Sequence, residues 1–201
     1  MSQIEFWFEF GSTYSYPAAM RIESLAKDEG VSVAWRPFLL GPIFREQGWE
    51  DSPFNIYPAK GRYMWRDLER VCAQQGLALR RPSTFPRNGL LAARLACCFA
   101  SEAWCPEFVR RVYHANFAED RDISEPRSLE STLESLGQPA ALLAKALSPE
   151  IKARLRSQTE HAASLGIFGA PTFIVDGELF WGNDRLEVAL SCAKSPAQER
   201  A

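Results

Sequence analysis

Little in this 201-residue sequence points to a membrane, a nucleic acid or a metal ion. The formal net charge is only −2, so neither a polyanion nor an acidic lipid surface is an expected partner. No stretch approaches the roughly 18 consecutive apolar residues of a membrane-spanning helix, and no leader-like pattern is present. The two histidines, His114 and His161, have no ligand partners at metal spacing, so we assign no metal. We predict a globular cytoplasmic protein.

Cysteine is scarce and badly placed for redox chemistry. The five cysteines show no spacing typical of a disulfide framework or a zinc site, so we expect reduced, largely buried thiols. Cys97 and Cys98 are neighbours on a predicted helix, where adjacent side chains point in different directions, which favours packing over a redox pair. The sequence therefore offers no thiol chemistry of its own.

The ends of the chain have the pattern of one sheet domain. A strand over residues 4–10, a helix over 14–29 that is stopped by Gly30, and a strand over 31–38 predict a parallel unit with a right-handed crossover. Near the C-terminus, strands at 172–175 and 178–181 flank Asp176-Gly177, the strongest short-range hairpin signal, and a last helix starts at Asn183-Asp184.

The middle of the chain is almost entirely helical in pattern. Residues 39–58 have no period and are predicted to form a long loop. Longer helices are predicted at 59–75, 88–102, 106–118 and 149–165, and shorter ones at 125–136 and 139–147. We therefore predict an α/β protein with a thioredoxin-like fold (residues 1–40 and 167–201) and an inserted loop and all-helical domain (residues 41–166).

Ser12 marks the predicted functional site. It lies where the first strand meets the first helix, a corner at which backbone N–H groups and the helix dipole favour an anion or a thiolate. A thioredoxin-type redox enzyme needs Cys-x-x-Cys here, yet positions 12 and 15 are both serine. A hydroxyl can hold a thiolate but cannot become one, so we predict a site for the sulfur of a ligand, with glutathione as the first candidate. The plain alternative is that Ser12 only caps the helix.

Four segments carry a family resemblance over essentially the full length. They are residues 8–16 (Phe-Glu-Phe-Gly-Ser-Thr-Tyr-Ser-Tyr), 55–67 (Asn-Ile-Tyr-Pro-Ala-Lys-Gly-Arg-Tyr-Met-Trp-Arg-Asp), 169–173 (Gly-Ala-Pro-Thr-Phe) and 181–185 (Trp-Gly-Asn-Asp-Arg). With these motifs the chain resembles the 2-hydroxychromene-2-carboxylate isomerase family, which is related to kappa-class glutathione transferases and to disulfide oxidases with a helical insert. It departs from the family at Thr13, where proline is common, and this puts the loop geometry in question.

The resemblance implies a glutathione site. Ser12 would donate a hydrogen bond to the glutathione sulfur, and the backbone of Ala170, before a cis Pro171, would pair with the glutathione peptide. Without the fold context, a trans proline that starts an edge strand is the plain alternative.

The γ-glutamyl end of glutathione would be held by four consecutive residues, which could also form no more than a helix cap. They are Gly182, Asn183, Asp184 and Arg185.

Substrate contacts are predicted at Asn55, Lys60 and, more weakly, Arg87. Basic side chains in the first turns of a helix oppose its dipole, so Lys60 needs another reason to be there. It either lies along the rim of the core, as long lysines do, or faces a cleft and holds a carboxylate together with Asn55.

The implied activity is a glutathione-dependent isomerisation of 2-hydroxychromene-2-carboxylate to trans-o-hydroxybenzylidenepyruvate, with a small aromatic substrate. The alternatives are a kappa-like glutathione transferase or peroxidase, and a non-catalytic thioredoxin-fold binding module. The resemblance also suggests a homodimer.

Overall fold

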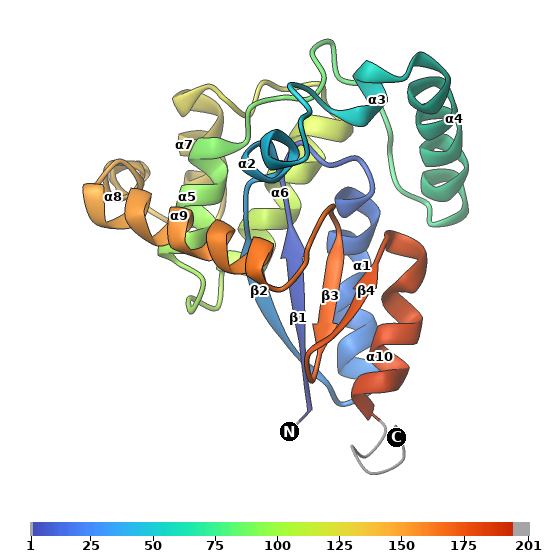
Figure 1. Cartoon of the computed structure of the whole chain (residues 1–201). Helices are drawn as coiled ribbons and strands as arrows, with labels where there is room; N and C mark the ends of the chain where they lie inside the picture. Colours follow the sequence, from blue (N-terminus) through green and yellow to red (C-terminus); the bar gives the residue numbers. More distant parts are fainter. Residues whose placement is uncertain (1, 195–201) are drawn as a thin grey trace.

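A four-stranded mixed sheet forms the centre of the computed structural model, which describes residues 2–194 (Figure 1). The strands are β1 (Gln3–Phe8), β2 (Ser32–Pro37), β3 (Thr172–Val175) and β4 (Glu178–Trp181), in the order β2-β1-β3-β4. β1 pairs with β2 in parallel, whereas β3 runs antiparallel to both β1 and β4. The two ends of the chain thus build one sheet, and the predicted α/β, thioredoxin-like fold is confirmed.

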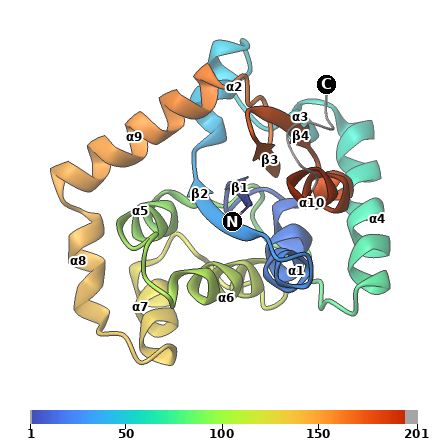
Figure 2. The same cartoon turned by 90° about the horizontal axis from the view of Figure 1, so that it is seen from below.

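Helices cover both faces of the sheet. α1 (Ser15–Asp28) is the crossover between β1 and β2, and α10 (Leu186–Lys194) lies beside it. Figure 2 shows α9 (Pro149–Ser164) across the sheet from α1 and α6 (Cys105–Phe117). Alternation along β1 explains this, since Phe6 and Phe8 belong to the large core and Trp7 to a smaller one with Ile174 and Ala162.

The segment between β2 and β3 is helical, as predicted. Besides α6 and α9 it contains α4 (Pro58–Gln74), α5 (Leu90–Cys98), α7 (Pro126–Ser135) and α8 (Leu143–Ala146), the last preceded by a 3₁₀ turn at Ala140–Leu142. One buried cluster runs from Phe6 and Phe8 of the sheet to Leu68, Val112 and Leu129 of these helices. The helical segment and the sheet therefore share a core, and the division at residues 41–166 stays a prediction.

The prediction of one long loop at residues 39–58 was wrong. α2 (Leu40–Glu46) and α3 (Pro53–Ile56) lie within it. α2 exists because Ile43 is buried against the smaller core, a tertiary contact that no local periodicity reveals. α3 has a local cause, because the Ser52 hydroxyl accepts the Phe54 N–H at 3.3 Å and Pro53 takes the first helical position.

None of the five cysteines, which all lie within residues 2–194, forms a disulfide, and Cys72, Cys97 and Cys105 are buried. Burial raises the pKa of the Cys72 thiol to about 11, so this side chain stays protonated near neutral pH. No helix within residues 2–194 is both long and apolar enough to span a membrane.

The continuous core predicts where the protein is sensitive to truncation. Leu68 is fully buried in α4, so Leu68→Ala should lower the free energy of unfolding by about 2–5 kcal/mol in urea denaturation. Val188→Ala is the matched aliphatic control, because Val188 is 51% exposed and its truncation should change little. Equal effects of the two substitutions would contradict the packing described here.

Candidate functional site

Ser12 lies at the corner between β1 and α1 and contacts the far end of the chain. Its hydroxyl donates to the Ala170 carbonyl at 2.9 Å, a contact across 158 residues of sequence. The Ser15 N–H donates to the same hydroxyl at 3.4 Å, and the Ser12 N–H donates to the Glu9 carbonyl at 3.0 Å. The residue that precedes α1 is Tyr14, so capping is at most a secondary role of Ser12.

The Ala170–Pro171 bond is cis, as expected from the resemblance. The Gly182 N–H donates to the Pro171 carbonyl at 2.9 Å, which joins the end of β4 to the start of β3. Ser12, Ala170, Pro171 and Gly182 are thus held together by direct hydrogen bonds. This cluster contains the centre of the predicted site.

An exposed aromatic pair lies beside Gly169, the residue before Ala170. The rings of Phe168 and Trp181 lie 4.9 Å apart between centroids, and the two residues are 44% and 52% exposed. Gly169 lies directly against the Trp181 ring, which keeps the ring beside the Ala170 backbone. The chain therefore offers an exposed aromatic surface beside Gly169, one residue before Ala170.

Glu9 is a half-buried carboxyl beside the Ser12 loop that sequence reasoning missed. Its Oε2 accepts the Gly11 N–H at 2.9 Å. Burial raises its pKa to about 7, although the N–H groups of Gly11 and Ser12 favour the charged form. An acidic residue inside the apolar run of residues 4–10 was the signal that could have revealed it.

Tyr14 was also missed, and it connects the corner to α4. Its hydroxyl donates to Asp67 Oδ2 at 2.8 Å, and its ring meets that of Phe54 in α3 with centroids 6.4 Å apart. Burial, and then the Asp67 carboxylate, raise the pKa of Tyr14 far above its usual range. α3 and α4 are therefore anchored beside the Ser12 corner.

Asn55 and Lys60 belong to this same part of the molecule, but neither is buried. The Asn55 amide donates to Asp51 Oδ2 at 3.0 Å and to the Phe85 carbonyl at 3.1 Å. Lys60 is exposed and its Nζ lies 5.1 Å from the centroid of the Tyr57 ring, so it does not line the core. Substrate contacts by these two side chains stay a prediction.

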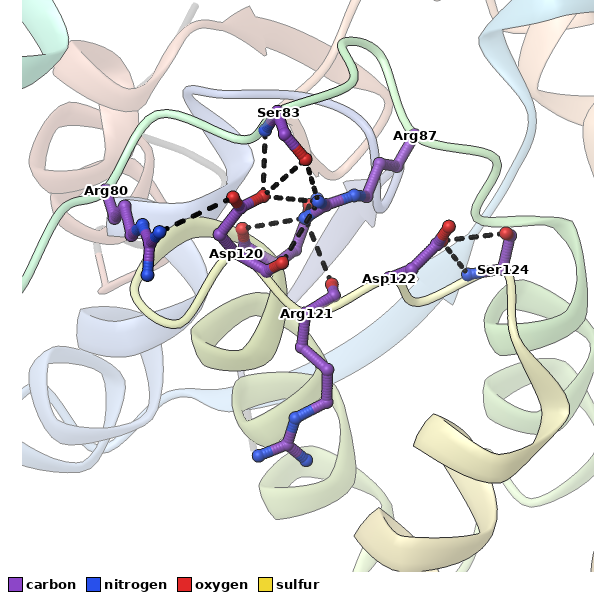
Figure 3. A network of polar contacts seen from close by, with 8 residues as sticks. Arg80, Ser83, Arg87, Asp120, Arg121, Asp122 and Ser124 are labelled. Atoms are coloured by element: carbon purple, nitrogen blue, oxygen red, sulfur yellow. Dashed lines mark hydrogen bonds and ion pairs between the residues drawn. The ribbon is translucent and has the colours of Figure 1, made fainter.

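Arg87, the third predicted substrate contact, is buried. Its side chain is only 4% exposed, and its terminal nitrogens donate to Asp120, Ser83, Asn116 and the Arg121 carbonyl (Figure 3). Both terminal nitrogens are thus engaged, and the remaining donor, Nε–H, is buried without a partner, so the guanidinium presents no exposed donor to a ligand. These contacts give Arg87 a structural role, and the substrate contact predicted for it stays a prediction.

The segment that follows β4 is a short 3₁₀ turn at Asn183–Arg185. Asn183 is buried, and its Oδ1 accepts a hydrogen bond from Arg21 of α1 at 3.1 Å. Asp184 and Arg185 are exposed and lie 3.4 Å apart between Oδ2 and Nη1. The Asn183 side chain thus connects this turn to α1. Asp184 and Arg185 face solvent, and binding of the γ-glutamyl end by these residues stays a prediction.

Residues 2–194 contain no group of three or more histidine, cysteine, aspartate or glutamate side chains able to hold a metal ion.

Comparison with known proteins agrees with this geometry. The model of the DSBA-like thioredoxin domain family matches residues 3–191. The chain belongs to this family. It is 31% identical over 187 residues to a 2-hydroxychromene-2-carboxylate isomerase of Sphingobium xenophagum, with 92% of this chain and 94% of the relative covered.

Two further likenesses support the same relationship. The chain is 27% identical to human glutathione S-transferase kappa 1, covering 92% of this chain and 88% of that protein. A solved structure of a 2-hydroxychromene-2-carboxylate isomerase superposes with a TM-score of 0.85 at 27% identity and covers 94% of this chain and 93% of its own. The resemblance predicted from the sequence motifs is confirmed.

The raised pKa of Glu9 predicts a pH-dependent stability. Unfolded Glu9 ionises near pH 4.5 and folded Glu9 near 7, so between these values the folded state binds more protons, and its stability falls as the pH rises. Relative to Glu9→Gln, the wild type should lose up to about 1.4 kcal/mol per pH unit between pH 4.5 and 7 in denaturation experiments.

The control is Glu46→Gln, which removes an exposed carboxylate. Its difference from the wild type should stay nearly flat over the same pH range. A flat profile for Glu9→Gln as well would contradict the raised pKa of the Glu9 carboxyl.

Proposed function

We propose that this protein is a glutathione-dependent isomerase that interconverts 2-hydroxychromene-2-carboxylate and trans-o-hydroxybenzylidenepyruvate in the breakdown of aromatic compounds. The observation that carries the proposal is the Ser12 hydroxyl, which lies in hydrogen-bond contact with the backbone before Pro171 where a redox enzyme would have a cysteine. The names of the isomerase relatives, which match 92% and 91% of this chain, support the substrate class.

The residues of the corner fit glutathione. The Ser12 hydroxyl carries one proton, which it donates to the Ala170 carbonyl. A thiolate placed beside Ser12 would accept a hydrogen bond from this hydroxyl in place of the Ala170 carbonyl. The Ala170 carbonyl would then be free to accept an N–H from a peptide ligand. When the Ser12 hydroxyl changes its acceptor from the Ala170 carbonyl to the sulfur, both the sulfur and the backbone of the tripeptide would gain a hydrogen bond.

Electrostatics favour a thiolate at this position. Ser12 lies just before the N-terminus of α1, where the helix dipole favours negative charge. A thiol held there should have a lowered pKa, as thiols near helix N-termini do. When bound, glutathione would supply a nucleophilic thiolate for a conjugated carbon of the substrate, so that rotation about the former double bond becomes possible.

Other residues would orient the two ligands. The exposed Phe168 and Trp181 rings would contact an aromatic substrate beside Ser12. Lys60 and Asn55 would hold a carboxylate from the side of α3 and α4, and Asp184 would pair with the ammonium group of the γ-glutamyl end.

A kappa-like transferase is the second candidate, because the kappa relatives match the chain over nearly the same length. The two reactions differ in what happens to glutathione. A transferase consumes it, whereas an isomerase returns it.

Ser12→Ala should weaken the binding of reduced glutathione about tenfold near neutral pH, because a hydrogen bond to a charged group is lost. Isothermal titration calorimetry measures this directly. Ser15→Ala is the matched control: Ser15 is fully buried at the same corner, so its hydroxyl cannot touch a ligand and binding should be retained. Absence of binding by the wild type would eliminate both glutathione-dependent activities.

Turnover of 2-hydroxychromene-2-carboxylate should require glutathione without consuming it. Following substrate by absorbance and free thiol by titration in one reaction should show many substrate molecules converted per glutathione, with the thiol concentration unchanged. Thiol loss equal to product formed would instead indicate a transferase, and no conversion under conditions of measurable glutathione binding would indicate a binding module.

A further inference from the structure

Two side chains of α6 hold the backbone that leads from β1 to Ser12. The Tyr113 hydroxyl donates to the Glu9 carbonyl at 2.9 Å, and the Asn116 amide donates to the Phe10 carbonyl at 3.2 Å. The Glu9 carbonyl is also the acceptor of the Ser12 N–H. The position of the Ser12 backbone therefore depends on contacts made by α6.

The orientation of the Asn116 amide is decided by Arg87. An arginine can only donate hydrogen bonds, and its Nη1 donates to Asn116 Oδ1 at 3.2 Å. This contact leaves the Asn116 NH₂ group to face the Phe10 carbonyl. With the amide reversed, NH₂ would face the guanidinium and oxygen would face a carbonyl, so both contacts would become repulsive.

Arg87 is in turn fixed by the loop that follows α6. Asp120 forms an ion pair with Nη2, and the carbonyls of Asp120 and Arg121 accept hydrogen bonds from the guanidinium at 3.1 and 3.0 Å (Figure 3). Asp120 also accepts the Ser83 N–H at 2.8 Å. The Ser83 N–H, and then Arg87, lower the pKa of Asp120 to about 2, so it keeps its charge near neutral pH.

The backbone of Arg87 supports the Ser12 loop at a second point. A side chain at Gly11 would bring its Cβ within 3.0 Å of the Arg87 carbonyl oxygen and 3.2 Å of Pro86 Cβ. Gly89 is packed in the same way, because a Cβ there would come within 2.6 Å of Phe10 Cβ. The segment that carries Arg87 therefore lies directly against the residues before Ser12.

We propose that Asp120, Arg87 and Asn116 act as a positioning relay that sets the place of the Ser12 hydroxyl toward the glutathione sulfur. None of the three touches the ligand. The effect of the relay on the glutathione sulfur rests on the proposed function. Its effect on the Ser12 loop does not, because that loop is held in the protein without glutathione. The relay gives a structural reason for the buried charge of Arg87, which the sequence analysis placed among the substrate contacts.

The test uses Asp120→Asn, Asn116→Ala and the double variant, with Glu107→Gln as control. Asparagine is chosen because Asp120 has φ 56°, a left-handed conformation that asparagine tolerates. Glu107 is a matched carboxylate of α6 that pairs with Arg110 and Arg111, and no contact joins it to the Ser12 loop. The first readout is hydrogen exchange of residues 9–16 in the protein without glutathione, and the second is the pH midpoint of the ultraviolet thiolate absorbance of bound glutathione.

Asp120→Asn should speed exchange in residues 9–16 about fivefold or more and raise the thiolate midpoint by about half a pH unit. Glu107→Gln should change neither. In the Asn116→Ala background the substitution of Asp120 should add little to either readout, because the relay is already broken.

A general loss of thermal stability with exchange raised throughout the chain and the thiolate midpoint unchanged would overturn the proposal. If the wild type bound no glutathione, the proposed function would fail, but the hydrogen-exchange experiment would still test whether the relay holds the Ser12 loop. Faster exchange confined to residues 9–16 in Asp120→Asn would support the relay, and unchanged exchange there would overturn it.

Discussion

The hydrogen bond between the Ser12 hydroxyl and the Ala170 carbonyl is the contact on which the site depends. It joins the end of β1 to the start of β3 across 158 residues, most of which are helical. The antiparallel pairing of β1 with β3 makes the contact possible, because Trp7 lies opposite Thr172, two residues after Ala170. The helical segment is therefore arranged around a site that the two ends of the chain build together.

Close packing of backbone on backbone supports this contact. Gly11 and Gly89 leave no room for a Cβ between the loop before Ser12 and the segment of residues 86–89. The Glu9 carboxyl lies in the same layer, and its burial raises its pKa to about 7. An unpaired buried polar group is costly, and hydrogen bonds from Tyr113, Asn116 and Arg87 satisfy the Glu9 carbonyl, the Phe10 carbonyl and the Asn116 amide oxygen.

Much of the fold and the centre of the site could be predicted from the sequence, because both leave local signals. Gly30 ends α1 with φ +69°, and Asp176-Gly177 forms the predicted hairpin turn. Ser12 and Pro171 were recognised through their motifs. Long-range contacts leave no such signal: Ile43 is buried by residues far along the chain, and the Arg87 charge is satisfied by Asp120, 33 residues away. Tyr14 and Glu9 were missed because their roles depend on partners and burial, not on spacing.

A crystal structure of the protein with reduced glutathione would show where the thiol is held. We expect the sulfur within hydrogen-bond distance of the Ser12 hydroxyl, with the peptide of glutathione paired to the Ala170 backbone. Glutathione bound elsewhere, or bound with its sulfur turned away from Ser12 while the Ser12–Ala170 hydrogen bond stays intact, would contradict this placement.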